Sequence, residues 1–140
     1  METTEVLIPE VFERRKGKPP VMRIAHGKLI FSVEAVNLLG LKEGDKLKFV
    51  LDKLDNGIVY FKKDDSGWPL MVDFSGLNGV RLRICCRPLA ARILSFFSFN
   101  QSKTFTIKKE TADYYGEQMW FFLKDGVHKP IKWRNQKNKL

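Results

Sequence analysis

Cysteine and histidine are scarce in this chain of 140 residues, which has two of each. The cysteines, Cys85 and Cys86, are adjacent, a spacing that suits neither a disulfide framework nor a CxxC metal pair. We therefore expect both thiols to be reduced, with one side chain facing the core and the other facing outward. The histidines, His26 and His128, have no metal-binding spacing, so we expect neither a metal nor a cofactor.

Long apolar segments and catalytic motifs are also missing. The apolar runs are far shorter than the roughly 20 residues of a membrane-spanning helix. The first residues, METTEVLIPE, contain three glutamates and no apolar core of a signal peptide. No P-loop, GxGxxG or GxSxG motif occurs, and no nucleophile is paired with a base. We therefore expect a soluble protein of the cytoplasm, or of a virion if a phage encodes it, that is not an enzyme and does not bind membranes.

Positive charge, by contrast, is abundant. The chain has 25 Lys and Arg residues against 16 Asp and Glu residues, which gives a net charge of +9. Basic residues are dense in ERRKGKPP, residues 13–20, and in KPIKWRNQKNKL, residues 129–140, which contains no acid. Such segments can follow a phosphate backbone or can serve only as solubilising tethers. Because its prolines oppose regular helix, we interpret residues 1–20 as an extended N-terminal arm, and residues 129–140 as a basic C-terminal tail.

Between these ends, the first half of the chain predicts short strands around one short helix. VMRIAHGKLIFS, residues 21–32, is typical of two strands with a turn at His26-Gly27. Ser32 is suited to cap the helix, and Gly40 occupies the position after its last turn that favours glycine. Gly44-Asp45 then predicts a turn into a hairpin of two strands, KLKFVLD and IVYFKK.

The second half repeats this order of elements. VRLRICC predicts a strand, RPLAARILSFFSF a helix that is longer than the first, and KTFTIKKE and MWFFLKD two further strands. A constant shift of 58 aligns apolar positions of residues 38–49 with residues 96–107, and a shift of 61 aligns residues 59–70 with residues 120–131. We therefore predict an internal duplication in a domain of residues 21–128, with repeat one at 21–72 and repeat two at 79–128.

HGKLIFSVEAVNLLGLKEGDKLKFVLD, residues 26–52, resembles the AbrB/MazE/SpoVT-type swapped-hairpin DNA-binding family. Gly27-Lys28 matches the opening Gly-basic pair of that family, and LGLKEGD, residues 39–45, matches its turn signature without a gap. Ser32 departs from the pattern, which usually has a proline there. The resemblance implies an α+β, mostly β, fold in which two tandem strand-helix-hairpin repeats of one chain form a pseudo-two-fold swapped-hairpin (AbrB-like) barrel.

The resemblance also implies a function, because basic residues on the first strands of each repeat face DNA in that family. An arginine can bind a phosphate or a guanine edge with two hydrogen bonds, whereas a lysine supplies a point charge. We therefore predict a non-enzymatic DNA-binding protein, either a transcriptional regulator or a nucleoprotein component. The candidate nucleic-acid-binding residues lie on the strands (Arg23, Lys28, Arg81, Arg83), in the arm (Arg14, Arg15, Lys16, Lys18) and in the tail (Lys132, Arg134, Lys137, Lys139).

Aromatic residues and the terminal arms leave two other functions open. Exposed aromatic rings, of which Trp133 is one candidate, can stack on the bases of single-stranded nucleic acid. Phe96 and Phe97 are adjacent, and we expect only one of them to face the core. Basic arms at both ends would equally suit a structural or assembly protein of a phage particle or other complex. Such a protein would bind a second copy or an assembly partner through its arms and exposed aromatics.

Overall fold

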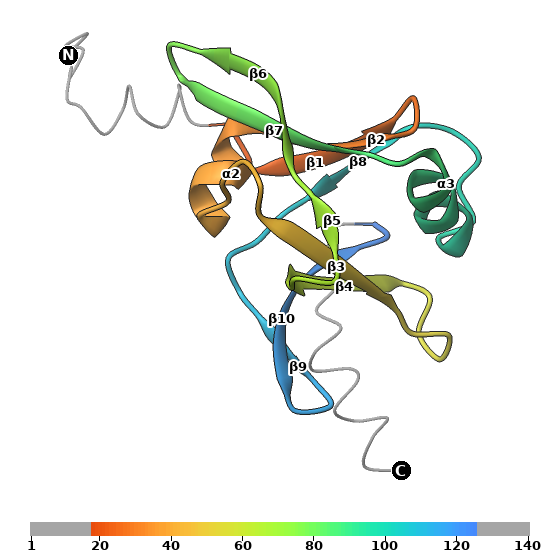
Figure 1. Ribbon diagram of the computed structural model, residues 1–140. Coiled ribbons are helices and arrows are strands. Elements are labelled where there is room, and N and C mark those ends of the chain that lie inside the picture. Colours follow the sequence, from red (N-terminus) through yellow and green to blue (C-terminus); the bar gives the residue numbers. More distant parts are fainter. Residues whose placement is uncertain (1–17, 126–140) are drawn as a thin grey trace, which may run out of the picture.

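A computed structural model describes residues 18–125 of the protein (Figure 1). Within these residues, strands dominate and there are two helices, which confirms an α+β, mostly β, protein. In chain order, the elements are β1 (Val21–Ala25), β2 (Lys28–Phe31), α2 (Val33–Leu39), β3 (Lys46–Leu51), β4 (Ile58–Lys63), β5 (Trp68–Pro69), β6 (Met71–Gly76), β7 (Gly79–Cys85), α3 (Arg87–Phe96), β8 (Lys103–Thr106), β9 (Ala112–Tyr114) and β10 (Glu117–Leu123).

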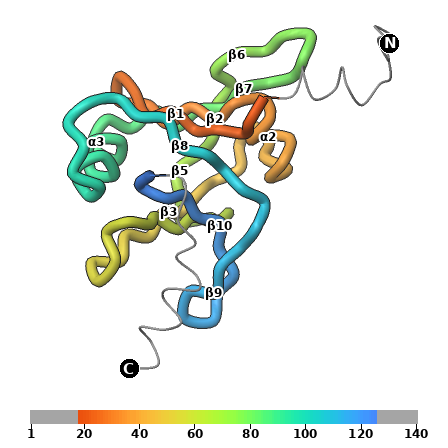
Figure 2. The backbone as a smooth tube through the Cα atoms, turned by 180° about the vertical axis from the view of Figure 1, so that it is seen from behind, coloured from red at the N-terminus to blue at the C-terminus, as the bar shows by residue number. Residues whose placement is uncertain are grey.

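The strands form two antiparallel sheets of five strands each. Sheet A has the order β6-β7-β2-β1-β8, and sheet B has the order β5-β3-β4-β10-β9. In Figure 1, sheet A lies above sheet B, with α2 and α3 at opposite ends of the layers. The view from behind shows β8 beside β1, although most of the chain separates the two strands in sequence (Figure 2). Each sheet therefore contains strands from both halves of the chain.

Three strand pairs join the two halves. Met22 in β1 lies opposite Phe105 in β8, and Ile30 in β2 lies opposite Arg83 in β7. In sheet B, β4 pairs with β10. Because a strand with an unpaired edge leaves backbone N–H and C=O groups without partners, each half completes the sheets of the other.

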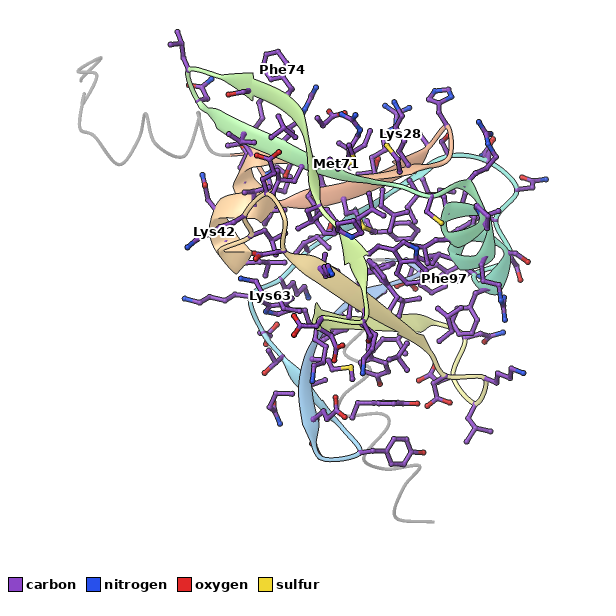
Figure 3. The ribbon with its side chains drawn as sticks, in the orientation of Figure 1. Lys28, Lys42, Lys63, Met71, Phe74 and Phe97 are labelled. Atoms are coloured by element: carbon purple, nitrogen blue, oxygen red, sulfur yellow. The ribbon has the colours of Figure 1, made fainter. Side chains whose placement is uncertain are left out.

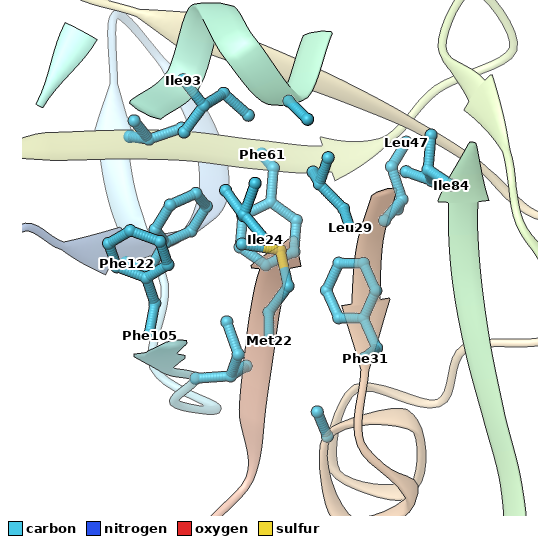
Figure 4. Packing of buried hydrophobic residues seen from close by; sticks show 14 of the residues in the cluster. Met22, Ile24, Leu29, Phe31, Leu47, Phe61, Ile84, Ile93, Phe105 and Phe122 are labelled. Carbon is cyan, nitrogen blue, oxygen red and sulfur yellow. The ribbon is translucent and has the colours of Figure 1, made fainter. Parts of the chain in front are cut away.

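The main core fills the space between the sheets (Figure 4). Met22 and Leu29 from sheet A meet Phe61 and Phe122 from sheet B, and all four side chains are almost completely buried. Ile93 adds a buried side chain from α3. Burying one such side chain stabilises the fold by about 1.5–3 kcal/mol, so this shared core holds the two halves together.

The end of α3 corrects one expectation from the sequence. Phe96 and Phe97 are only 8% and 0% exposed, and both belong to the main core, so the prediction that only one of them faces the core is wrong. Phe96 is the last residue of α3, and Phe97 is its C-cap, where the chain leaves the helix. Since the core wraps around this end of the helix, two consecutive rings reach it from different directions.

Local signals around α2 are confirmed. The Ser32 hydroxyl oxygen accepts hydrogen bonds from the amides of Ala35 and Val21, each at 3.1 Å. The Ser32 amide in turn donates to the Val21 carbonyl oxygen at 2.9 Å. Gly40 ends the helix with a φ of +65°, and Gly44 has a φ of +94° in the turn that follows. Ser32 therefore both caps α2 and ties it to β1.

Three strands, β5, β6 and β9, were not predicted from the sequence. Residues of β6 run across the predicted end of repeat one at residue 72 and form a hairpin with β7. A register shift between Val72 and Phe74 interrupts the alternation of β6, which hides the strand pattern. The predicted longer second helix is confirmed, with 10 residues in α3 against 7 in α2.

Candidate nucleic-acid interface

Sheet A carries all four predicted basic strand residues on its outer face, which we call the basic face (Arg23, Lys28, Arg81, Arg83). Arg23 lies opposite Ile30 of β2, and Ile30 lies opposite Arg83 of β7. Residues on either side of Arg23 and Arg83 are buried in the core, so the alternation of a strand turns the arginines outward. Neighbouring strands are about 4.8 Å apart, which places Arg23 and Arg83 within about 10 Å of each other.

The two arginines of β7 share one carboxylate. Asp73 of β6 lies 3.2 Å from Arg81 Nε and 3.6 Å from Arg83 Nη1. Arg83 is held further, because Nη1 donates to the Val72 carbonyl oxygen at 2.7 Å and Nε donates to Cys85 Sγ at 3.0 Å. The contacts with Cys85 and then Asp73 raise the pKa of Arg83, which remains charged. These two arginines are therefore fixed in place and partly neutralised.

Arg23 and Lys28, unlike the two arginines of β7, are not held by Asp73. Arg23 is exposed and Lys28 is half-buried, and neither has a hydrogen bond or ion pair with any part of the chain that the structure describes. Lys28 lies opposite Cys85, two residues along β2 from the row that joins Arg23 to Arg83. Their charges are thus available to an anionic partner.

The turn between β1 and β2 extends the basic face. His26 and Gly27 both have positive φ, 54° and 75°, as a tight two-residue hairpin requires. A Cβ atom on Gly27 would lie 3.2 Å from Arg87 Cβ, so glycine allows Arg87 to pack against the turn. Arg87 is exposed, and sequence reasoning did not select it.

An apolar patch adjoins the arginines. Met71 and Phe74 of β6 lie opposite Arg83 and Arg81, and they are 46% and 54% exposed. The Arg81 guanidinium lies 5.1 Å from the centre of the Phe74 ring, a cation–π contact. Figure 3 shows Lys28 and Phe74 projecting from the upper side of the molecule, whereas Lys42 and Lys63 project from the α2 end. This patch was not predicted, because the sequence pattern does not reveal β6.

The other predicted basic residues are placed only in part. Lys18 is exposed just before β1. The remaining arm residues and all the tail residues lie outside the described residues, as does Trp133 (Arg14, Arg15, Lys16, Lys132, Arg134, Lys137, Lys139). The two cysteines follow the prediction: Cys85 is exposed on the basic face, and Cys86 is half-buried against the core.

A second basic site lies apart from this face. A cleft of about 610 Å³ between β8 and the end of β10 is lined by Phe99, Lys103 and Lys124. The two lysine Nζ atoms lie 4.7 and 5.7 Å from the centre of the Phe99 ring. Lys103 is opposite Ile24, a core residue, so it belongs to the inner side of sheet A and does not extend the basic face.

Comparisons with family models, with curated proteins and with solved structures find no match to this chain. The resemblance to the swapped-hairpin family therefore depends on the sequence of residues 26–52 and stays a prediction. Neither helix within residues 18–125 is long and apolar enough to cross a membrane.

Proposed function

We propose that this protein is a non-enzymatic DNA-binding protein that contacts DNA with the basic face of sheet A. The observation that carries the proposal is the strand register, which brings basic side chains from both halves of the chain onto one surface. Four positive charges face one negative charge there, that of Asp73. A surface with such an excess attracts the phosphates of a nucleic acid by releasing their counterions.

The pairing between the halves supports the finer fold in this proposal, a swapped-hairpin barrel built by one chain. In such a barrel, equivalent strands of the two repeats pair with each other at the pseudo-two-fold axis. The shift of 61 that aligns the repeats carries Tyr60 onto Phe121, and these two residues lie opposite each other in β4 and β10. Equivalent positions that face each other are what a two-fold axis through this pair requires.

The charges suggest two kinds of contact. Arg23 and Lys28 have no partner in the described part of the chain, and they neutralise phosphates. Arg81 and Arg83 are oriented by Asp73, and a fixed guanidinium can donate two parallel hydrogen bonds to a phosphate or to a guanine edge.

The double variant Arg23→Ala/Lys28→Ala tests the proposal. We expect the affinity for a duplex, followed by fluorescence anisotropy at low salt, to fall by about tenfold for each residue. The slope of log K against log salt should shrink by about 2, since each phosphate contact contributes about 0.9. Lys53→Ala/Lys109→Ala is the matched control, because it removes the same charge from two exposed residues outside the basic face.

Two results would contradict the proposal. If both double variants weaken binding equally, the net charge matters and the basic face does not. If the wild-type protein binds no duplex even at low salt, the assembly role, which the exposed patch of Met71 and Phe74 favours, replaces DNA binding. A single-stranded probe in the same assay distinguishes the third function: tighter binding to it would indicate base stacking.

A further inference from the structure

The edge of sheet A formed by β6 is open, and exposed apolar side chains gather on it. Among residues 18–125, β6 pairs on one side only, with β7. Seven large apolar side chains are exposed in this part of the chain, and four of them belong to β6 or to the turn after it (Met71, Val72, Phe74, Leu77). Figure 3 shows Phe74 projecting from β6 away from the core. Such a patch marks a contact with another protein surface, and DNA binding by the charged residues gives it no role.

β6 differs from the three other strands that lie at the edge of a sheet. β5 has two residues, one of which is Pro69, and β9 has three residues. β8 has four residues and carries Lys103. Short length, proline and lysine each hinder the pairing of an edge with another strand. β6 has six residues without Pro, Lys or Arg, so among the four edges of the described residues it is best suited to accept a strand.

The backbone of β6 is regular beyond its one irregularity. The register shift lies at Asp73, between Val72 and Phe74. Residues 74–76 then pair in regular register with residues 79–81 of β7. In a regular antiparallel pair, alternate residues turn their N–H and C=O groups to opposite sides of the strand. This segment therefore presents backbone donors and acceptors to the free edge.

The strand that fits this edge is β6 of a second copy, because the exposed apolar residues are placed symmetrically. Met71 and Leu77 each lie three residues from Phe74. An antiparallel pair about a two-fold axis at Phe74 brings the two Phe74 side chains together and places Met71 of each copy beside Leu77 of the other. Each copy then covers the apolar residues of its partner with the same residues, as an isologous contact requires.

Charge does not oppose this pairing. Asp73 is the charged residue of β6, and it is paired with Arg81 and Arg83 within each copy. Across the axis, the Arg81 residues of the two copies lie three strand spacings apart, about 14 Å. This exceeds the screening length of about 8 Å at physiological salt. Added salt therefore does not weaken the contact, whereas it weakens the binding of a nucleic acid.

We infer that two copies of this chain form a dimer by antiparallel pairing of their β6 edges, which joins two sheets A into one continuous sheet. One strand edge is much smaller than a standard interface of roughly 20–30 residues on each side. We therefore expect a weak dimer, with a dissociation constant of about 10–100 µM. The contact forms between copies of the protein alone and does not depend on DNA binding.

Sedimentation equilibrium on the full chain, freed of nucleic acid, tests the inference. The mass of the wild type should rise from 16.3 kDa towards twice that value as the concentration is raised from about 1 to about 500 µM. Phe74→Lys should weaken the dimer at least about tenfold, because it removes the central ring and places a charge on the edge. Leu77→Lys should weaken it too, and the full exposure of Leu77 means that this variant leaves the fold intact.

Leu54→Lys is the matched control. Leu54 is also an exposed apolar side chain, 77% exposed, but it lies in the connection between β3 and β4 of sheet B, so this variant should form dimers like the wild type. Hydrogen exchange followed by mass spectrometry then locates the contact. The amides of residues 71–76 should exchange more slowly at high protein concentration in the wild type and in Leu54→Lys, but not in Phe74→Lys.

Three results would overturn the inference. A wild-type protein that stays at 16.3 kDa up to about 500 µM does not form this contact. A dimer that is as strong in Phe74→Lys and Leu77→Lys as in the wild type depends on another surface. A dimer that is lost when the salt concentration is raised from about 0.1 to about 0.5 M is held by charges and not by the β6 edge.

Discussion

Ser32→Ala removes one oxygen atom from a junction between two elements. In the wild type, that oxygen accepts hydrogen bonds from the Ala35 amide in the first turn of α2 and from the Val21 amide at the start of β1. Losing a helix N-cap costs about 1 kcal/mol. Leaving the half-buried Val21 amide without its partner costs about 1 kcal/mol more. We therefore expect the free energy of unfolding to fall by about 2 kcal/mol.

Urea denaturation followed by circular dichroism measures this change, and a thermal scan should show the melting temperature lowered by about 6–8 °C. Ser32→Thr is the control, because it keeps a hydroxyl oxygen and should stay within about 0.5 kcal/mol of the wild type. Ser32→Pro introduces the residue that the resembled family usually has at this position. It should be more damaging than Ser32→Ala, because it also removes the amide that donates to the Val21 carbonyl oxygen.

The junction would be unimportant if Ser32→Ala left stability within about 0.5 kcal/mol of the wild type. If Ser32→Thr were as damaging as Ser32→Ala, the effect would come from packing around the side chain and not from the hydrogen bonds.

Further predictions concern two turn glycines, a carboxylate and the tail. Gly44→Val should lower the free energy of unfolding by about 1 kcal/mol or more, because Gly44 has a φ of +94°. Gly79→Ala should lower it further, since the added Cβ would also lie 2.7 Å from Val33 Cγ1. Urea denaturation measures both changes, and unchanged midpoints would contradict both. Hydrogen bonds from the Ser66 hydroxyl and amide lower the pKa of Asp64 to about 2. The stability that Asp64 contributes is therefore fully present above the unfolded pKa of about 3.9, and it is lost as the pH falls through about 2. NMR titration of Ser66→Ala should show the pKa of Asp64 raised, and an unchanged pKa would rule out the hydroxyl as a cause. Deleting residues 134–140 removes three basic residues, so the slope of log K against log salt for duplex binding should shrink by up to about 3. The affinity for specific and random duplexes should fall by equal factors. A fall in affinity for the specific sequence alone would show that the tail contacts bases.

The sequence predicted best what depends on a few neighbouring residues. Ser32 and Gly40 define the two ends of α2 through contacts within one helical turn, and both ends were found where expected. His26-Gly27 likewise specifies a turn through its own backbone. Such signals are local because the hydrogen bonds involved are local.

The candidate site could be predicted only in part, because it depends on pairing between distant strands. Alternation indicated that Arg23 and Arg83 are exposed, but only the register through Ile30 shows that they share a face. The pairing of Asp73 with two arginines was not predicted, for a related reason: the irregularity between Val72 and Phe74 displaces the pattern of β6 and leaves Asp73 within reach of both. No spacing in the sequence reports which carboxylate a bulge turns toward which strand.

The interleaved strand pairs also determine when this protein can fold during its synthesis. A ribosome releases the N-terminal half first, yet residue 22 finds its partner only at residue 105, and residue 60 finds its partner only at residue 121. Until nearly the whole chain has emerged, β1, β2 and β4 expose unpaired edges to solvent or to chaperones. Nascent chains that stop before β10 should therefore be sensitive to proteases along their entire length, and resistance should appear in one step when β10 leaves the exit tunnel.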